Sequence, residues 1–330
     1  MKTFLKILKV LVVIVIVFVG GIITFALTSY KKTFEAPYPN IKASSDSAII
    51  ARGKHLALGP AHCADCHASL SERAKVDAGE EVALSGGFNF ILPIGTLYTP
   101  NITSDPETGI GNLTDGEIAR SLRYGIRHDG QAMIDLMPFY DLSDDDLTAI
   151  ISWLRTQPPI KNERPKNEYT LLGKMVKTYA LGPTGDADVP AAPPEGANAA
   201  YGKYLVNSVA NCRGCHTERN LMDGSFVGPE LAGGFPFELI NEKGEIIKGK
   251  HLISPNLTTD AETGIMASWS QEEFVERFRT GRVIPGSPMP WGPFSRMDEM
   301  ELIAIYKYLS SLSPIRLEIP TGIQEGDPDV

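Results

Sequence analysis

The stretch HCADCH at residues 62–67 has a second copy, NCRGCH, at residues 211–216, and together they hold all four cysteines of the chain. Each copy places two cysteines three positions apart, with a histidine directly after the second cysteine. On a helix, positions i, i+3 and i+4 share one face, so this spacing gathers two thiols and an imidazole on one side. The pattern predicts two equivalent sites built on short helices.

The two motifs lie within a longer internal repeat that keeps the same order throughout. The matching segments, first copy before second, are RGKHL from Arg52 and YGKYL from Tyr201, SGGFNF from Ser85 and AGGFPF from Ala232, TPNITSDPETGI from Thr99 and SPNLTTDAETGI from Ser254, SLRYG from Ser121 and RFRTG from Arg277, and Met137-Pro138 and Met289-Pro290. Each copy closes on a helical pattern, at residues 147–154 and 302–309. Gly53 and Gly202 weaken the helices that hold them, so we expect the closing helix of each copy to cross there at close range.

The length and the charge of the chain limit what the repeat can be. A chain of 330 residues fits two domains with connecting segments, and a net charge of -9 argues against nucleic acid as a partner. A short hairpin is expected between Phe237 and Lys248, turning at residues 241–244. The expected boundaries are an anchor at 1–32, a linker at 33–47, domains at 48–160 and 199–316, an inter-domain linker at 161–198 with a weak helical pattern at 171–181, and a solvated tail at 317–330.

The first 32 residues differ from everything that follows. An apolar run extends from Val10 to Leu27, with three lysines before it and two more at residues 31 and 32. About 18 apolar residues are just enough to span a bilayer core as a helix. A cleavable signal has a shorter apolar segment and a small-x-small cleavage site, which the sequence at residues 26–28 does not provide. We therefore expect an uncleaved membrane anchor.

Three chemistries use a C-x-x-C pair: thiol redox exchange, zinc binding and covalent haem attachment. The histidine separates them, because C-x-x-C-H is the haem-attachment signature, whereas neither a disulfide nor a zinc site requires histidine there. In such a motif two thiols are joined to the haem while the imidazole meets the iron from the same side. We therefore expect two covalently bound haem c groups, one on Cys63 and Cys66 with His67 as iron ligand, and one on Cys212 and Cys215 with His216.

A methionine in each copy is the candidate for the second axial ligand of each iron. Met137 and Met289 occupy the same Met-Pro context, and His/Met ligation is typical of electron-transfer haems. Methionines also fill gaps in cores, so alternatives exist. Met133 competes with Met137 in the first copy, and Met297 and Met300 lie on the closing helix of the second.

Taken together, these features resemble the class I cytochrome c domains of membrane-bound dehydrogenase cytochrome subunits, which carry electrons from alcohol, aldehyde or gluconate dehydrogenases. The resemblance covers about residues 48–159 and 200–315. It implies an all-α fold of two tandem class I cytochrome c domains after an N-terminal transmembrane helix. It also implies a bacterial plasma membrane protein with its haem domains on the periplasmic side. The chain departs from the family in having two haem domains where three are common, so the dehydrogenase partnership carries over less well than the fold.

The resemblance further implies that a backbone carbonyl fixes each haem histidine, and the Gly-Gly loops at 86–87 and 233–234 are the expected source. Asn101 and Asn256, in the repeated PN block, could reach a haem propionate, although stabilising a turn is the simpler role for such a side chain.

The expected function is transfer of single electrons from a dehydrogenase or quinol donor to a terminal oxidase or a soluble carrier, without substrate chemistry. Two Met-ligated irons would leave no open position for a substrate. One alternative is the electron-entry subunit of a cbb-type haem-copper oxidase. The other is a dihaem peroxidase, which needs one iron able to lose its ligand. His62, beside Cys63, could replace a ligand in such a state, although a satisfied histidine is the simpler interpretation.

Overall fold

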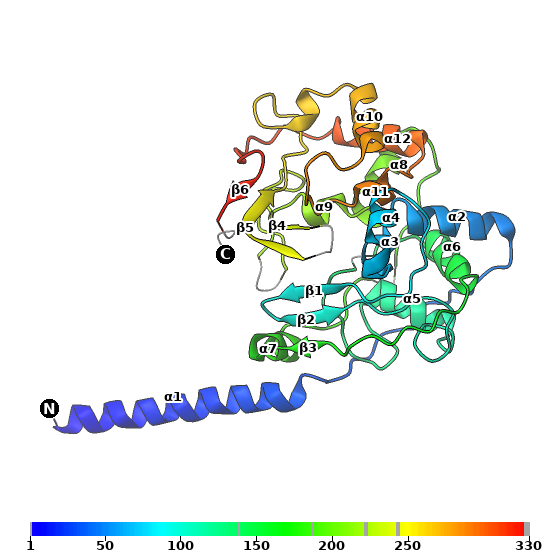
Figure 1. Ribbon diagram of the computed structural model, residues 1–330. Coiled ribbons are helices and arrows are strands. Elements are labelled where there is room, and N and C mark those ends of the chain that lie inside the picture. Colours follow the sequence, from blue (N-terminus) through cyan, green and yellow to red (C-terminus); the bar gives the residue numbers. More distant parts are fainter. Residues whose placement is uncertain (1, 138, 187, 221–223, 242–244, 327–330) are drawn as a thin grey trace.

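The computed structural model describes residues 2–137, 139–186, 188–220, 224–241 and 245–326. Helix α1 (Lys2–Ser29) projects from the body as one long rod, and the body is built mainly from short helices around two small sheets (Figure 1). We call residues 48–160 the first unit and residues 199–316 the second unit.

Some of the helices of the body occur in equivalent places in the two units. Those in or beside the first unit are α2 (Ser47–Leu58), α3 (Cys63–His67), the 3-10 helix η1 (Leu70–Glu72), α4 (Arg73–Asp77), α5 (Asp115–Tyr124) and α6 (Asp144–Arg155). Those of the second are α8 (Ala199–Tyr204), the π-helical segment η2 (Leu205–Val209), α9 (Cys212–Cys215), the 3-10 helix η3 (Ile265–Ala267), α10 (Gln271–Thr280), α11 (Trp291–Phe294) and α12 (Glu299–Leu309). Helix α7 (Leu171–Tyr179) lies in the connecting segment, where the sequence predicts a weak helix.

Two three-stranded antiparallel sheets accompany the helices. The expectation of an all-α fold is therefore only partly met. The first contains β1 (Asn89–Leu92), β2 (Gly95–Tyr98) and β3 (Glu168–Tyr169); the second contains β4 (Pro236–Ile240), β5 (Ile246–Ile253) and β6 (Gln324–Glu325). The hairpin expected near Phe237 is present as β4 and β5, although residues 242–244 of its expected turn lie outside the described residues. The last strand, β6, pairs with β5 within the segment expected as a solvated tail.

The hairpin of β1 and β2 has no counterpart in the sequence expectations. Strand β2 also pairs with β3, which comes from the connecting segment, and this pairing joins Thr96 to Glu168. A two-residue strand such as β3 carries almost no local signal, because its partner lies far away in the sequence.

The predicted close crossing of helices is confirmed in both units. A Cβ atom on Gly53 would lie 1.8 Å from the carbonyl oxygen of Ala149 in α6, and one on Gly202 would lie 1.9 Å from that of Ala304 in α12. Only glycine permits main chains to approach this closely. The first helix and the closing helix of each unit are thereby fixed against each other, and the motif helix follows directly from the first of them.

Helix α1 is not isolated from the body, because its last two turns pack against α7 (Figure 1). Ala26 is fully buried there, and the hydroxyl of Tyr179 donates a hydrogen bond of 2.8 Å to the carbonyl of Ile22. The rings of Phe25 and Tyr179 lie 6.1 Å apart. The rest of α1 is exposed, and it is the one helix among the described residues long and apolar enough to cross a bilayer.

Candidate haem sites

The two motif helices begin in the same way. His62, just before α3, and Asn211, just before α9, both adopt the left-handed conformation, with φ of 41° and 49°. Few residues other than glycine adopt this conformation, so its presence at the same repeat position marks a shared local geometry. In each copy the chain enters the motif helix through this left-handed residue, which directly precedes the first cysteine.

Each motif histidine is fixed through one ring nitrogen. The Nδ1 atom of His67 is 2.9 Å from the carbonyl oxygen of Pro100, and that of His216 is 3.0 Å from the carbonyl oxygen of Pro255. A ring N–H donated to a carbonyl at Nδ1 fixes the tautomer and leaves Nε2 as the nitrogen able to bind a metal. Burial lowers the pKa of His67, which favours the neutral imidazole that a metal requires.

The carbonyl that holds each histidine comes from the PN block, and the expectation that it would come from the Gly-Gly loops is wrong. The Gly-Gly loops instead contact the backbone of each histidine. The N–H of Gly86 donates a hydrogen bond of 2.7 Å to the carbonyl of His67, and the N–H of Gly233 donates one of 2.8 Å to that of His216. A Cβ on Gly86 would lie 2.5 Å from the carbonyl carbon of Pro100, so the glycine lets the loop lie against the PN block.

Asn101 and Asn256 have the structural role that was the simpler expectation. The side-chain amide of each donates a hydrogen bond of 2.7 Å to a backbone carbonyl beyond the closing helix, at Ile160 and Ile315 respectively. The side-chain oxygen of Asn101 accepts from the N–H of Thr103. Because both ends of the buried amide are engaged within the protein, these side chains hold the PN block in place and are not free to bind a propionate.

The thiols do not have the lowered pKa of a reactive redox pair. Desolvation raises the pKa of the Cys63 and Cys212 thiols to about 12, whereas reactive C-x-x-C thiols have a lowered pKa. Among the described residues, which include every cysteine, one group of three metal-binding side chains comes together, and it consists of His55, Asp298 and Glu301. The four cysteines therefore do not form a common metal cluster.

The donor sets of the two motifs instead fit a covalently attached haem. Each motif offers two thiols and an imidazole from one short helix, with the imidazole already held at Nδ1. Cys63 and Cys212 are half-buried against the hydrophobic core of the molecule, and so are Met137 and Met289. Apolar walls and a soft thioether suit an iron porphyrin that exchanges electrons without binding a substrate.

The candidate methionines share a local backbone feature. The N–H of Phe139 donates a hydrogen bond of 2.9 Å to the carbonyl of Met137, and the N–H of Trp291 donates one of 2.8 Å to that of Met289. Pro138 itself lies outside the described residues. Among the alternatives, Met297 is 1% exposed and belongs to the core. Met133 follows the β-bridge of Ile126 and Ala132, outside that core.

The two units meet across a polar seam in which equivalent residues face each other. Arg52 and Tyr201 hold the same repeat position, and the guanidinium donates a hydrogen bond of 3.0 Å to the phenol oxygen. Beside this pair, the hydroxyl of Tyr204 donates one of 2.7 Å to the carboxylate of Asp146 in the first unit. The N–H of Ser143 also donates to the phenol oxygen of Tyr204. These contacts relate the units by an approximate two-fold axis near Arg52 and Tyr201.

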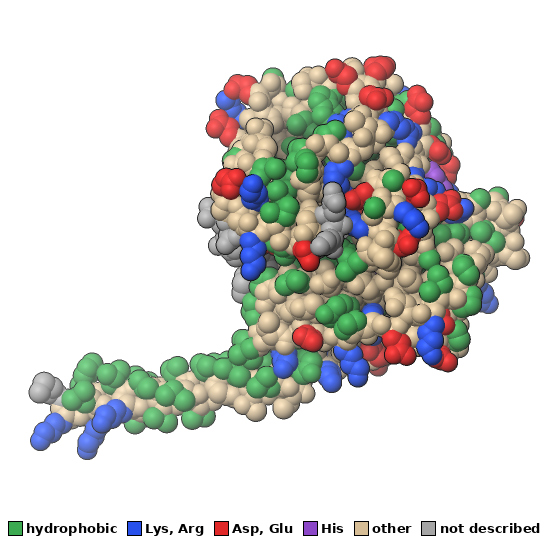
Figure 2. Space-filling model, in the orientation of Figure 1, with side chains coloured by type: hydrophobic (Ala, Val, Ile, Leu, Met, Phe, Trp, Pro, Cys, Tyr) green, Lys and Arg blue, Asp and Glu red, His purple; other side chains and the backbone are tan. Residues whose placement is uncertain are grey.

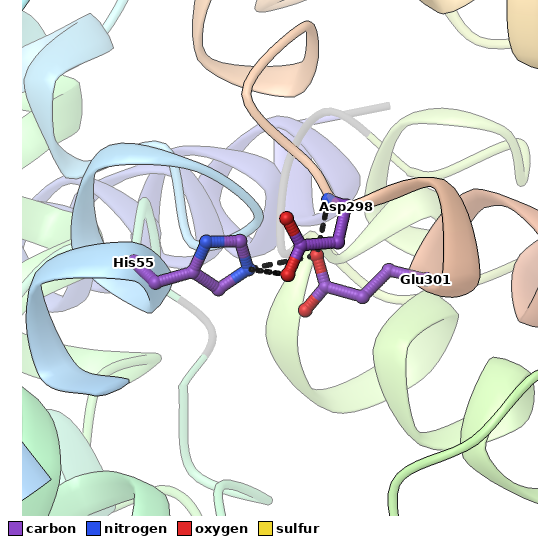
Figure 3. Close-up of side chains that lie close together, drawn as sticks. All are labelled: His55, Asp298 and Glu301. Atoms are coloured by element: carbon purple, nitrogen blue, oxygen red, sulfur yellow. Dashed lines mark hydrogen bonds and ion pairs between the residues drawn. The ribbon is translucent and has the colours of Figure 1, made fainter. Parts of the chain in front are cut away.

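On the other side of this axis, the contact equivalent to that of Tyr204 with Asp146 is an ion pair between His55 and Glu301. Figure 3 shows His55 of the first unit directed at Asp298 and Glu301 of the second, with its Nε2 2.8 Å from Glu301 Oε2. This hydrogen bond raises the pKa of His55 above its ordinary value. The other oxygen of Glu301, which is buried, lies 3.7 Å from the guanidinium of Arg52. With a fixed cation already beside Glu301, the cluster is an inter-unit ion pair and not a metal site.

Both motifs lie beside this seam. The ring of His62 packs edge-on against Phe294 of the second unit, 5.4 Å away, while its Nδ1 is 3.1 Å from the carbonyl oxygen of Pro60. His62 is thus the satisfied histidine that was the simpler expectation. Helix α11, which follows Met289, packs on α4, where a Cβ on Gly292 would lie 1.9 Å from the carbonyl oxygen of Val76.

The second motif makes a corresponding contact with the first unit. Arg219, shortly after His216, forms an ion pair of 3.6 Å with Asp135, which lies just before Met137. Each candidate methionine segment therefore touches the unit that carries the other motif, and the two candidate sites lie on one seam (Figure 1).

A scan against models of protein families finds no match for the chain. Similarity to individual proteins is extensive, and the chain is a homologue of cytochrome c subunits of dehydrogenases. A cytochrome c subunit of a quinone-dependent alcohol dehydrogenase from Gluconobacter oxydans (strain 621H) is 32% identical over 256 residues, covering 72% of this chain and 48% of the relative. The cytochrome subunit of a fructose dehydrogenase from Gluconobacter japonicus is 27% identical, covering 82% of this chain and 54% of the relative.

A third relative is itself named as a protein with two haem groups, which matches the number of C-x-x-C-H motifs in this chain. A dihaem c-type cytochrome from Cereibacter sphaeroides is 31% identical over 182 residues, covering 52% of this chain and 58% of the relative. The chain spans about half the length of these curated relatives.

Proposed function

We propose that the protein is a membrane-anchored dihaem cytochrome c that transfers single electrons. Support comes from two C-x-x-C-H motifs in equivalent settings, each with its histidine held at Nδ1, together with homologues named as cytochrome c subunits. A haem bound at each site would supply one-electron chemistry at its iron. We further propose that residues 48–160 and 199–316 form two tandem class I cytochrome c domains.

The four cysteines and two histidines have separate roles in this proposal. Cys63 and Cys66 would hold one haem through thioethers, and Cys212 and Cys215 the other. The motif histidines, His67 and His216, would bind iron through Nε2, because Nδ1 is engaged by a prolyl carbonyl. Mass spectrometry of the purified chain tests this directly. We expect a mass increase of two haem groups, and a single haem after Cys212 and Cys215 are both replaced by alanine.

Met137 and Met289 are the proposed second axial ligands. Replacing either with alanine should remove the methionine-to-ferric-iron charge-transfer band of one haem, because the thioether is lost from that iron. Met133→Ala and Met300→Ala are the matched controls and should leave both bands in place. An unchanged band in Met137→Ala or Met289→Ala would show that another residue completes the coordination.

We propose a dehydrogenase subunit as the electron donor, since the homologues are named as subunits of such enzymes. A terminal oxidase or a soluble cytochrome would be the acceptor. The chain would act as a carrier and not as an enzyme, because two methionine-ligated irons leave no vacant position. Peroxide reduction by the purified dihaem chain should be negligible beside its reoxidation by a membrane oxidase. Rapid turnover of peroxide would instead identify a peroxidase.

We also propose that α1 remains as a single-pass anchor in a bacterial plasma membrane, with both units on the periplasmic side. Its end is packed into the body, and Ala26 has no exposed surface. A cleaved signal segment has no reason to complete the packing of the folded chain. The mass of the membrane-extracted protein should therefore include residues 2–32. Absence of this segment from the mature chain would disprove the anchor.

A further inference from the structure

The connecting helix α7 offers a second contact with the membrane that neither the motifs nor the relatives assign. We propose that the end of α7, residues 177–180, lies in the outer lipid interface and sets how closely the first unit approaches the bilayer. This inference rests on the proposed anchoring by α1.

The level of α7 relative to the bilayer follows from its contacts with α1. The apolar run from Val10 to Leu27 is about 27 Å long at 1.5 Å per residue, against roughly 30 Å of hydrocarbon. The outer edge of the hydrocarbon therefore falls at or beyond Leu27. Ile22 lies five residues earlier, which puts its carbonyl about 7 Å below that point along the helix. Because the hydroxyl of Tyr179 bonds to this carbonyl, the end of α7 reaches membrane level.

The direction of α7 is opposite to that of α1. Near its start, Lys174 stacks over the ring of Tyr30 at 5.2 Å, close to the end of α1. Near its end, Thr178 and Tyr179 contact α1 at residues 22–26. Helix α7 thus descends toward the bilayer, and its last turn is the deepest part.

The chemistry of this last turn suits a lipid interface. Tyr179 is 51% exposed while its hydroxyl is hydrogen-bonded, so this aromatic residue is accessible at the surface and its polar end is satisfied. The ammonium group of Lys32 donates to the carbonyl of Thr178, which would otherwise be an unpaired group at the end of a helix. Figure 2 shows hydrophobic side chains along α1 continuing onto the part of the body where it joins.

Helix α7 is also fixed to the first unit. The hydroxyl of Thr170 donates a hydrogen bond of 2.9 Å to the carbonyl of Pro93 in the turn between β1 and β2. A Cβ on Gly173 would lie 1.9 Å from the carbonyl oxygen of Ile94, so the helix and the turn are in close main-chain contact. A helix held both by the anchor and by this hairpin transmits the position of the membrane to the first unit.

Nitroxide labels on single added cysteines can measure the depth of α7. In the holoprotein the four native cysteines are proposed to be consumed by thioethers, so Ala180→Cys or Tyr38→Cys provides a single reactive thiol. Both positions are exposed, and Tyr38 lies beside α5, away from α7. Leu171→Cys, at the exposed start of α7, is an intermediate position. The full chain is kept oxidised, because a haem reductant would also reduce the nitroxide, and it is placed in phosphatidylcholine–phosphatidylglycerol vesicles. Each accessibility is taken as the change from a nitrogen-equilibrated sample, which subtracts any relaxation by the ferric haem.

The measured quantity is the accessibility of each label to oxygen relative to a water-soluble nickel complex. We expect this ratio at position 180 to be several-fold higher than at position 38, with position 171 between them. Equal ratios at 180 and 38, in protein that still floats with the vesicles, would overturn the role of α7 and leave the anchor intact. Failure of the chain to float with the vesicles would instead overturn the anchor, and this inference with it.

Discussion

Substituting Gly53 with alanine tests the helix crossing on which the first unit is built. The added Cβ would lie 1.8 Å from the carbonyl oxygen of Ala149, whereas ordinary contacts of this kind begin near 3.4 Å. The two helices would have to separate by about 1.5 Å, because a backbone carbonyl cannot rotate away as a side chain can. Overpacking of this kind costs typically 1–3 kcal/mol, while alanine regains up to about 1 kcal/mol of helix propensity. Since the clash is with main chain, we expect a net loss near 2 kcal/mol.

Gly116→Ala is the matched control, because Gly116 also lies in a helix, α5, but has room for a methyl group. Its nearest neighbour would be the Cβ of Tyr38 at 3.6 Å, an ordinary contact. We expect this variant to be about 0.5–1 kcal/mol more stable than the parent, because alanine loses less backbone entropy than glycine.

Guanidinium titration of the holoprotein in detergent, followed by far-UV circular dichroism, measures both free energies of unfolding. Gly202→Ala, with a Cβ contact of 1.9 Å to Ala304, should behave like Gly53→Ala. If Gly53→Ala were no less stable than Gly116→Ala, the close crossing of α2 and α6 would not exist in solution.

Two further predictions concern the seam between the units. Tyr204→Phe removes the hydroxyl that donates to buried Asp146, and we expect the free energy of unfolding to fall by about 1–3 kcal/mol in the same titration. An unchanged free energy of unfolding would mean that the units do not meet there. The raised pKa of His55, caused first by its hydrogen bond to Glu301, contributes stability that is complete below about pH 6.5 and lost as the pH rises through the higher folded-state value. The melting temperature should therefore fall more between pH 6 and pH 8 for the parent than for His55→Gln. Equal falls in melting temperature would contradict the pairing with Glu301.

The sequence was sufficient wherever the same constraint occurs in both copies. Gly53 and Gly202 predicted the helix crossings, because a glycine repeated within a helix points to close contact at that position. The motif spacing likewise predicted two short helices carrying the cysteines, and α3 and α9 begin at those residues. Such features are local or duplicated, so one chain supplies its own comparison.

The seam and most of the sheet pairing could not be predicted, since they depend on partners that are distant and different in type. The local hairpin of β4 and β5 was the exception. Nothing near His55 indicates that its partner is Glu301, 246 residues further along the chain. The source of the carbonyl behind each histidine was missed for a related reason. The PN block repeats, but a backbone carbonyl has no residue-specific signal, so the pattern points to the asparagine side chain and not to the carbonyl of the preceding proline.

One difference between the copies lies where they meet, and the two-fold arrangement explains it. Near the axis, a residue faces its own counterpart, so identical units would place Arg52 against a second arginine. Two guanidinium groups about 3 Å apart in a buried site would repel strongly. A tyrosine at position 201 removes the second charge and accepts the hydrogen bond that Arg52 donates.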